Sequence, residues 1–158
     1  MTRINCIPVE ELADQHLMAE YRELPMINAS LKRSLLSKSQ TGMKTIPADY
    51  TLNAGHVKFF YNKGLFLRNR YEELITELKR RKYNVNPAER SVDWSVFCMY
   101  DKSLNANWVP ELRDQRINVE RLILRLEDKV SWYKHYRKPI DNEFVRNMKE
   151  KYIGLPVN

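Results

Sequence analysis

The sequence predicts an all-α protein: a compact single domain of three main helices with long loops, in which the N-terminal segment packs between the helices. Apolar residues recur every three or four positions along three stretches, which is the pattern of amphipathic helices. No stretch shows the alternation of apolar and polar residues that is typical of a β-strand. A chain of 158 residues, 43% of them hydrophobic, is long enough to bury one modest core.

The first predicted helix runs from Leu12 to Leu24, with Asp14 as its N-terminal cap. Its apolar positions are Leu12, Ala13, Leu17, Tyr21 and Leu24. Pro25 lacks a backbone N–H, so we expect a kink or break there. Helical spacing resumes through Ile27, Leu31 and Leu35. The stretch 37–53 is rich in Ser, Thr, Pro and Gly and predicts a loop.

A second helix is predicted from about Leu65 to Lys82, with one apolar side formed by Leu67, Tyr71, Leu74, Ile75 and Leu78. It ends in a run of four basic residues, 79–82, which we interpret as complementing the negative end of the helix dipole rather than as reading bases. The segment 83–108 contains Pro87 and scattered aromatic residues, and it predicts irregular structure.

The third helix is predicted over 110–130, with a core-facing side formed by Leu112, Val119, Leu122, Ile123, Leu126 and Val130. Arg121, Arg125 and Lys129 follow one another at steps of four, so they form a basic stripe on this helix.

The charge and cysteine content narrow the class of partner and the compartment. Lys and Arg number 27 against 20 Asp and Glu, and the sequence pI is about 9.4. This excess favours a polyanionic partner, with nucleic acid ahead of an anionic membrane surface. Cys6 and Cys98 lie far apart and form no metal-binding spacing, which favours a reducing cytoplasm over a disulfide framework. The sequence contains no apolar run long enough to predict a membrane span. We expect the protein to be a monomer.

The chain start offers a nucleophile. Thr2 is small, so Met1 is expected to be removed, which leaves a free α-amine on Thr2. An α-amine has a pKa of roughly 7.7–8, so much of it is unprotonated near neutral pH. With a carboxylate beside it, such an amine can perform imine chemistry.

His16, Glu20 and Glu23 are spaced to share one face of the first helix, where a carboxylate could stabilise a cationic intermediate. The spacing alone favours a plainer interpretation, in which both glutamates are solvated surface charges and His16 is a satisfied polar residue. His56 and His135 are scattered and no metal-binding motif occurs, so we expect neither a metal nor another cofactor.

The segment 132–138 interleaves aromatic and basic residues, a pattern that suits stacking on bases together with contacts to phosphates. The alternative is that Trp132 and Tyr136, four residues apart, anchor the chain end onto the core. Both interpretations hold together if one side of each ring is buried.

Three blocks of sequence resemble the phage-encoded pyrimidine-dimer DNA glycosylases, historically called endonuclease V. They are T-R-I-N followed by E-L-A-D-Q-H-L-M-A-E-Y-R-E-L-P within 2–25, A-G-H-V-x-F-F at 54–60, and W-Y-K-x-Y-x-K-x-I at 132–140. The region 83–108 is much less similar. The resemblance implies a DNA repair enzyme of a phage-infected or bacterial cell. Such an enzyme is a bifunctional glycosylase and abasic-site lyase that acts on cyclobutane pyrimidine dimers in duplex DNA.

The resemblance also assigns roles to residues. Thr2 is the nucleophile that attacks the sugar C1′, and Glu23 stabilises the developing positive charge and assists the proton abstraction before β-elimination. The family kinks the duplex and flips out the nucleotide opposite the lesion. The residues expected to contact DNA are Arg3, Gln15, His16, Arg22, Arg121, Arg125, Trp132, Tyr133, Lys134, Tyr136 and Lys138.

The chain departs from the family pattern at a few positions. Met26 stands where the family has an arginine near the damaged site, and His135 and Arg137 replace an aromatic and a small residue. We expect a glycosylase-like domain over 1–140 and a basic C-terminal extension over 141–158. Two alternatives remain open from these residues: the same imine chemistry on a different damaged or modified base, and a DNA-binding protein without turnover.

Overall fold

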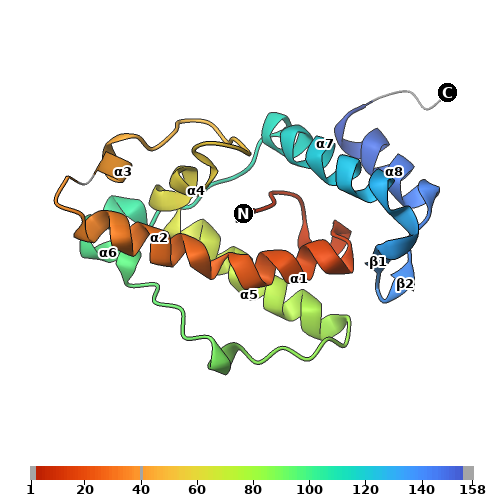
Figure 1. The fold of residues 1–158 in the computed structure, drawn as a ribbon, viewed down its shortest axis with the longest axis horizontal. Helices are drawn as coiled ribbons and strands as arrows, with labels where there is room; N and C mark the ends of the chain where they lie inside the picture. The colour runs from red at the N-terminus through yellow and green to blue at the C-terminus, as the bar shows by residue number, and fades with distance from the viewer. Residues whose placement is uncertain (1–2, 40, 155–158) are drawn as a thin grey trace.

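The structure is a computed structural model that describes residues 3–39 and 41–154, and it is built almost entirely of helices (Figure 1). Five helices in this part of the chain have ten or more residues: α1 (Asp14–Glu23), α2 (Pro25–Leu36), α5 (Gly64–Arg80), α7 (Leu112–Asp128) and α8 (Asn142–Tyr152). Three more have four residues each: α3 (Thr41–Lys44), α4 (His56–Phe59) and α6 (Val96–Met99). The all-α prediction is confirmed, but the prediction of three main helices is too low.

Four helices and one hairpin were not predicted: the four-residue helices α3, α4 and α6, and α8, although its buried residues Val145, Met148 and Tyr152 recur at helical spacing. Pro25 breaks the first predicted helix into α1 and α2, as expected, because proline fits the first turn of a new helix better than the interior of an old one. The strands β1 (Lys134–His135) and β2 (Lys138–Pro139) pair antiparallel, which the search for alternating residues missed. Strands of two residues are too short to show an alternation.

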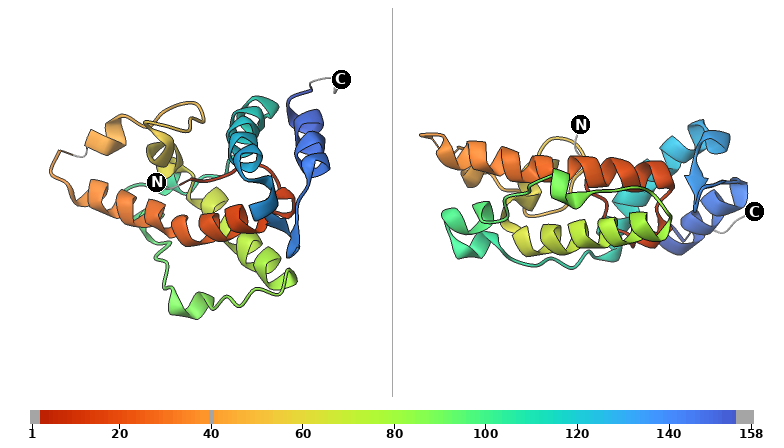
Figure 2. Two further views of the ribbon diagram at one scale, coloured as in Figure 1. Left: turned by 45° about the vertical axis from the view of Figure 1, so that its right-hand side comes forward. Right: turned by 90° about the horizontal axis from the view of Figure 1, so that it is seen from below.

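The helices form two layers that enclose the start of the chain. Seen from below, α1 and α2 lie in one layer above α5 (Figure 2, right), and α7 runs along the other side of the N-terminal segment with α8 outside it (Figure 1). Ile4 and Ile7 are fully buried in the common core together with Leu17, Leu67 and Leu74. The predicted packing of the N-terminal segment between helices is confirmed.

α7 buries the apolar side that its spacing predicts, formed by Val119, Leu122, Ile123 and Leu126. Leu112 is 58% exposed, so its assignment to the core is wrong; it is the first residue of the helix and extends beyond the neighbouring elements. α8 packs on α7 through Val145, Met148 and Tyr152. The division of the chain at residue 140 stays a prediction. No helix in the described part of the chain combines the length and the hydropathy needed to cross a bilayer.

A buried cation joins α5 to the segment before α1. Arg81 has a fully buried side chain that donates hydrogen bonds to Asp14 Oδ1 at 2.8 Å, to Glu77 Oε1 at 3.0 Å and to the carbonyl of Leu12 at 2.7 Å. The interpretation of the run 79–82 through the helix dipole did not include this role: Arg81 directly follows the last residue of α5, and its side chain is buried among carboxylates and carbonyls. The prediction of Asp14 as a helix cap is wrong: α1 begins at this residue, and its carboxylate binds Arg81, Tyr83 and two hairpin amides instead.

Candidate active site

Four consecutive backbone N–H groups at the start of the described chain each donate to a side chain from a different place in the sequence. The bonds are Arg3 N to Glu23 Oε2 (3.1 Å), Ile4 N to His56 Nε2 (2.9 Å), Asn5 N to Glu20 Oε1 (3.1 Å) and Cys6 N to Asn118 Oδ1 (2.8 Å). Buried N–H groups require partners, and here side chains from α1, α4 and α7 supply them instead of a neighbouring strand. The path of the chain start is thus set by three helices at once.

Glu20 is the central anchor of this arrangement. Glu20 is 1% exposed. Its carboxylate accepts two hydrogen bonds from Asn5 and two from the guanidinium of Arg70, the latter at 2.7 and 3.2 Å. Arg70 also donates to the carbonyl of Ile7 at 2.6 Å. The interpretation of Glu20 as a solvated surface charge is therefore wrong. A buried, fully paired carboxylate of this kind orients the segment that it binds.

A cavity of about 310 Å³ opens beside the chain start. Three guanidinium groups line it, from Arg3 at the chain start and from Arg121 and Arg125 on α7, and Glu23 lines it from α1. Burial lowers the pKa of Arg3, and the positive charges of Arg121 and Arg125 lower it further. Three neighbouring cations repel one another when the cavity is empty, so a negatively charged ligand relieves that repulsion.

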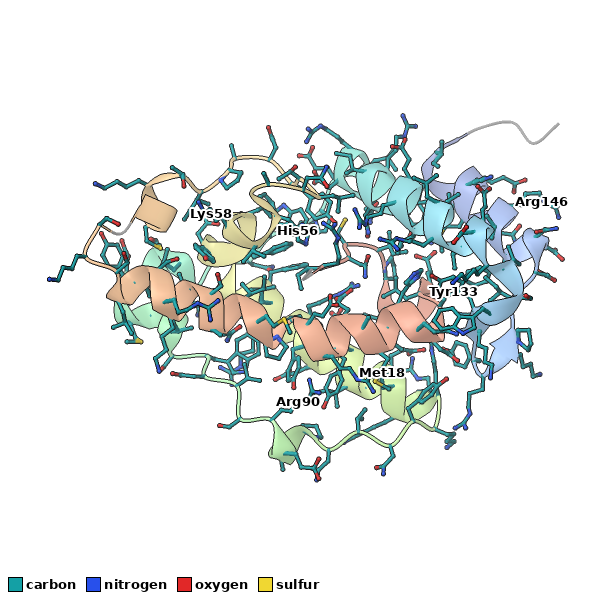
Figure 3. All side chains as sticks on the ribbon, in the orientation of Figure 1. Met18, His56, Lys58, Arg90, Tyr133 and Arg146 are labelled. Atoms are coloured by element: carbon teal, nitrogen blue, oxygen red, sulfur yellow. The ribbon has the colours of Figure 1, made fainter. Side chains whose placement is uncertain are left out.

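His16 and Tyr133 form another wall of the same cavity, with their ring centroids 4.8 Å apart. Burial, and then the charge of Arg125, lowers the pKa of His16 to about 4. His16 is therefore neutral at pH 7, and it offers a ring face and hydrogen bonds rather than a positive charge. Figure 3 labels Tyr133 at the right-hand end of α1.

Six of the predicted site residues thus line one cavity: Arg3, His16, Glu23, Arg121, Arg125 and Tyr133. Thr2 lies outside the described residues. Four others line a separate groove along α1, namely Gln15, Arg22, Trp132 and Lys134. Gln15 is a bridge within that groove, because it donates to the carbonyl of Trp132 at 2.7 Å and accepts from the N–H of Lys134 at 3.0 Å.

The remaining two predicted residues, Tyr136 and Lys138, belong to the hairpin. The Tyr136 hydroxyl donates to Glu77, and its ring lies 4.5 Å from the guanidinium of Arg81, so this side chain anchors the hairpin to α5. Tyr136 and Arg137 both have positive φ, 51° and 66°, as a two-residue hairpin turn requires. Trp132, by contrast, is 57% exposed, which leaves ring surface for stacking.

Several residues of the site were not singled out from the sequence. His56, Asn118, Arg70 and Asn5 all bind the chain start or its anchor. For two of them the sequence offered a sign of such a role, namely a polar residue on an otherwise apolar helix face. Asn118 precedes Val119 and Leu122, and Arg70 lies between Leu67 and Leu74. Within residues 3–39 and 41–154, no group of three or more His, Cys, Asp or Glu side chains could hold a metal ion.

A helical fold whose cavity presents clustered guanidinium groups beside a carboxylate defines a class of protein: one that binds a polyanion and offers acid–base chemistry at the bound site. A family model described as pyrimidine dimer DNA glycosylase matches residues 1–91. The match covers more than half of the chain, and this protein belongs to the pyrimidine dimer DNA glycosylase family, an enzyme family whose substrate is damaged DNA. Residues 92–158 lie outside the match, although they supply Asn118, Arg121, Arg125 and Tyr133 to the site.

Proposed function

We propose that the protein is a bifunctional DNA glycosylase and abasic-site lyase that acts on cyclobutane pyrimidine dimers through an imine formed by the α-amine of Thr2. Removal of Met1 frees this amine. Its nitrogen attacks the sugar C1′ beneath the damaged pyrimidine, and the bond between C1′ and the base breaks. The departing base takes up a proton from the attacking nitrogen. The sugar ring then opens as the C1′–O4′ bond breaks and O4′ takes up a proton, and the protonated imine formed between the nitrogen and C1′ links the chain start to the DNA. Loss of the C2′ proton then breaks the C3′–O bond, and water releases the cleaved strand.

Glu23 is assigned two roles in this sequence of steps. Its negative charge stabilises the cation that develops at C1′ as the base leaves. It then assists removal of the C2′ proton, which the protonated imine acidifies by acting as an electron sink. Arg3, Arg121 and Arg125 hold the phosphates of the substrate strand against the cavity, which offsets the cost of distorting the duplex.

The observation that carries the proposal is the hydrogen bond from Arg3 N to Glu23 Oε2, at 3.1 Å. Thr2 precedes Arg3 by one peptide bond, and consecutive Cα atoms are about 3.8 Å apart. The Glu23 carboxylate thus binds the residue that follows the proposed nucleophile, and this supports the pairing of Glu23 with the α-amine. Covalent catalysis of this kind requires the nucleophile and the proton acceptor to come within hydrogen-bond reach of each other.

Borohydride trapping tests the proposal directly. Protein that mass spectrometry shows to lack Met1 is incubated with duplexes that carry a cyclobutane dimer, another pyrimidine lesion or no lesion. We expect a covalent adduct with the dimer duplex, mapped by peptide sequencing to the α-amine of Thr2. If an adduct forms with another lesion and not with the dimer, the substrate is that lesion and the assignment to cyclobutane dimers is wrong. If no duplex yields an adduct, the imine mechanism is wrong.

The proposed phosphate contacts predict a steep dependence of binding on salt. Each phosphate contact contributes roughly 0.9 to the slope of log K against log salt concentration. Changing both Arg121 and Arg125 to Gln is expected to lower that slope by up to about two, because two cations no longer displace counterions. Arg68→Gln, an exposed cation of α5, serves as the matched control. Equal slopes for all three proteins would show that the basic stripe of α7 does not contact DNA.

A further inference from the structure

His56 is a buried histidine that does not line the cavity. It binds the chain start through one ring nitrogen and the loop before α4 through the other. It is 2% exposed and begins the short helix α4 (Figure 3). Its Nδ1 lies 2.7 Å from the carbonyl of Thr51, and its Nε2 lies 2.9 Å from the backbone nitrogen of Ile4. It does not line the 310 Å³ cavity, so it is not a contact for the DNA bound there.

These two partners fix the protonation state of the ring. The carbonyl of Thr51 can only accept, so Nδ1 carries the hydrogen. The amide of Ile4 can only donate, so Nε2 presents its lone pair, and the imidazole is neutral. The rings of Tyr50 and Phe60 pack edge-on against it, and the nearby charged groups are the cations Arg3 and Arg121. Burial is the main reason that the pKa of His56 is lowered to about 4.

Ile4 is held at both of its backbone polar groups. While His56 accepts from its N–H, the hydroxyl of Tyr50 donates to its carbonyl at 2.9 Å. The side chain of Ile4 is fully buried as well. Ile4 follows Thr2 by two residues, so this fixed point limits the positions that the α-amine can reach to a radius of about 7–8 Å.

We propose that His56 is a positioning residue for the reaction of the chain-terminal amine, and that it acts by fixing the Ile4 amide through Nε2. The inference rests on the proposed function, since it concerns the amine that forms the imine. Glu20 and Asn118 hold the next two residues in the same way, but they line the cavity, whereas His56 is not among the residues that line it. Substitution of His56 can therefore test the positioning of the chain start without removing a side chain that lines the cavity.

Two substitutions at this position distinguish hydrogen bonding from packing. His56→Leu fills the apolar surroundings but offers no acceptor to Ile4. His56→Gln can accept from Ile4 through its amide oxygen and donate to Thr51 through its amide nitrogen. We expect His56→Leu to slow single-turnover imine trapping on dimer DNA about 100-fold, the loss typical of misplacing a reacting group by 1 Å. Its affinity for the same DNA stays at the wild-type value, and His56→Gln recovers most of the rate.

Tyr50→Phe supplies a second variant in case His56→Leu does not fold. It keeps the ring but removes the bond to the carbonyl of Ile4, and it is expected to slow trapping without weakening DNA binding. Amide hydrogen exchange at Ile4 should be faster in His56→Leu than in wild type or His56→Gln, and nitrogen NMR of the wild-type ring should show the neutral form with hydrogen on Nδ1.

The outcomes separate the two proposals. If wild-type protein forms the adduct and His56→Leu and Tyr50→Phe form it at the same rate, the positioning role is refuted while the imine mechanism stands. A loss of DNA affinity that accounts for the whole loss of rate refutes it too. If wild-type protein forms no adduct at all, the imine mechanism fails first and the positioning role falls with it.

Discussion

Replacing Glu23 with Gln is expected to lower both base release and strand cleavage by about 1,000-fold or more, because it removes a charge and a proton acceptor together. The amide retains an oxygen that can accept from Arg3 N, so the hydrogen bond at the chain start, 3.1 Å in the native protein, can persist. The loss then reports on chemistry and not on a displaced chain start. Single-turnover assays on dimer-containing duplex and on a preformed abasic site measure the two steps separately.

The control for this experiment is Glu72→Gln on α5, which removes the same charge from an exposed position away from the cavity. Its rates should equal those of wild type. The affinity of Glu23→Gln for dimer DNA is expected to be unchanged or tighter, because the substitution removes a negative charge from a site that binds phosphates. Wild-type cleavage rates in Glu23→Gln would show that the carboxylate has no part in the reaction.

Replacing Arg81 with Met is expected to destabilise the fold by about 3–5 kcal/mol, the range seen when one partner of a buried ion pair is removed. The side chain is fully buried, and its loss leaves Asp14 without its cation and removes one donor from each of the carbonyls of Val9, Glu10 and Leu12. Methionine replaces the aliphatic part of the arginine side chain, so the change removes mainly the guanidinium group and its hydrogen bonds.

Urea unfolding monitored by circular dichroism measures this effect as a shift in the midpoint at constant slope. Arg68→Met, in which the arginine is exposed on the same helix, is expected to stay within about 0.5 kcal/mol of wild type. If Arg81→Met also falls in that range, the cluster around Asp14 contributes nothing net to stability. Glu77 keeps Arg80 and Tyr136 as partners in the variant, which favours the lower half of the expected range.

The helices α1, α2, α5 and α7 could be predicted because their signal is local, whereas α8 was expected only as a basic extension. The apolar side of α7 repeats within four residues, and the break at Pro25 follows from a missing N–H, so both were correct before any tertiary contact was known. The hairpin failed the same test: its turn depends on positive φ at Tyr136 and Arg137, residues without the glycine or asparagine that would have marked it.

The polar contacts of the site could not be predicted in this way, because their partners are distant in sequence. Glu20 and Arg70 are 50 residues apart, and Cys6 and Asn118 are 112 apart. Helical spacing favoured a solvated Glu20, and only the arrival of α5 with Arg70 and of the N-terminal segment with Asn5 buries and satisfies it. The buried role of Arg81 depends in the same way on partners distant in sequence, since Leu12 and Asp14 precede it by 69 and 67 residues.

The sequence alone was enough to predict the helical fold class and the basic side of α7, because both depend on the spacing of residues within a few positions. It was also enough to find the family resemblance that assigns roles to Thr2 and Glu23, because that resemblance lies in contiguous blocks. Folding decided which charges are buried, which amides the chain start donates to, and that Arg3, Glu23, Arg121 and Arg125 line one cavity. The physical reason is that burial and hydrogen bonding depend on distance in space, and α7 contacts the chain start although more than a hundred residues separate the two in sequence.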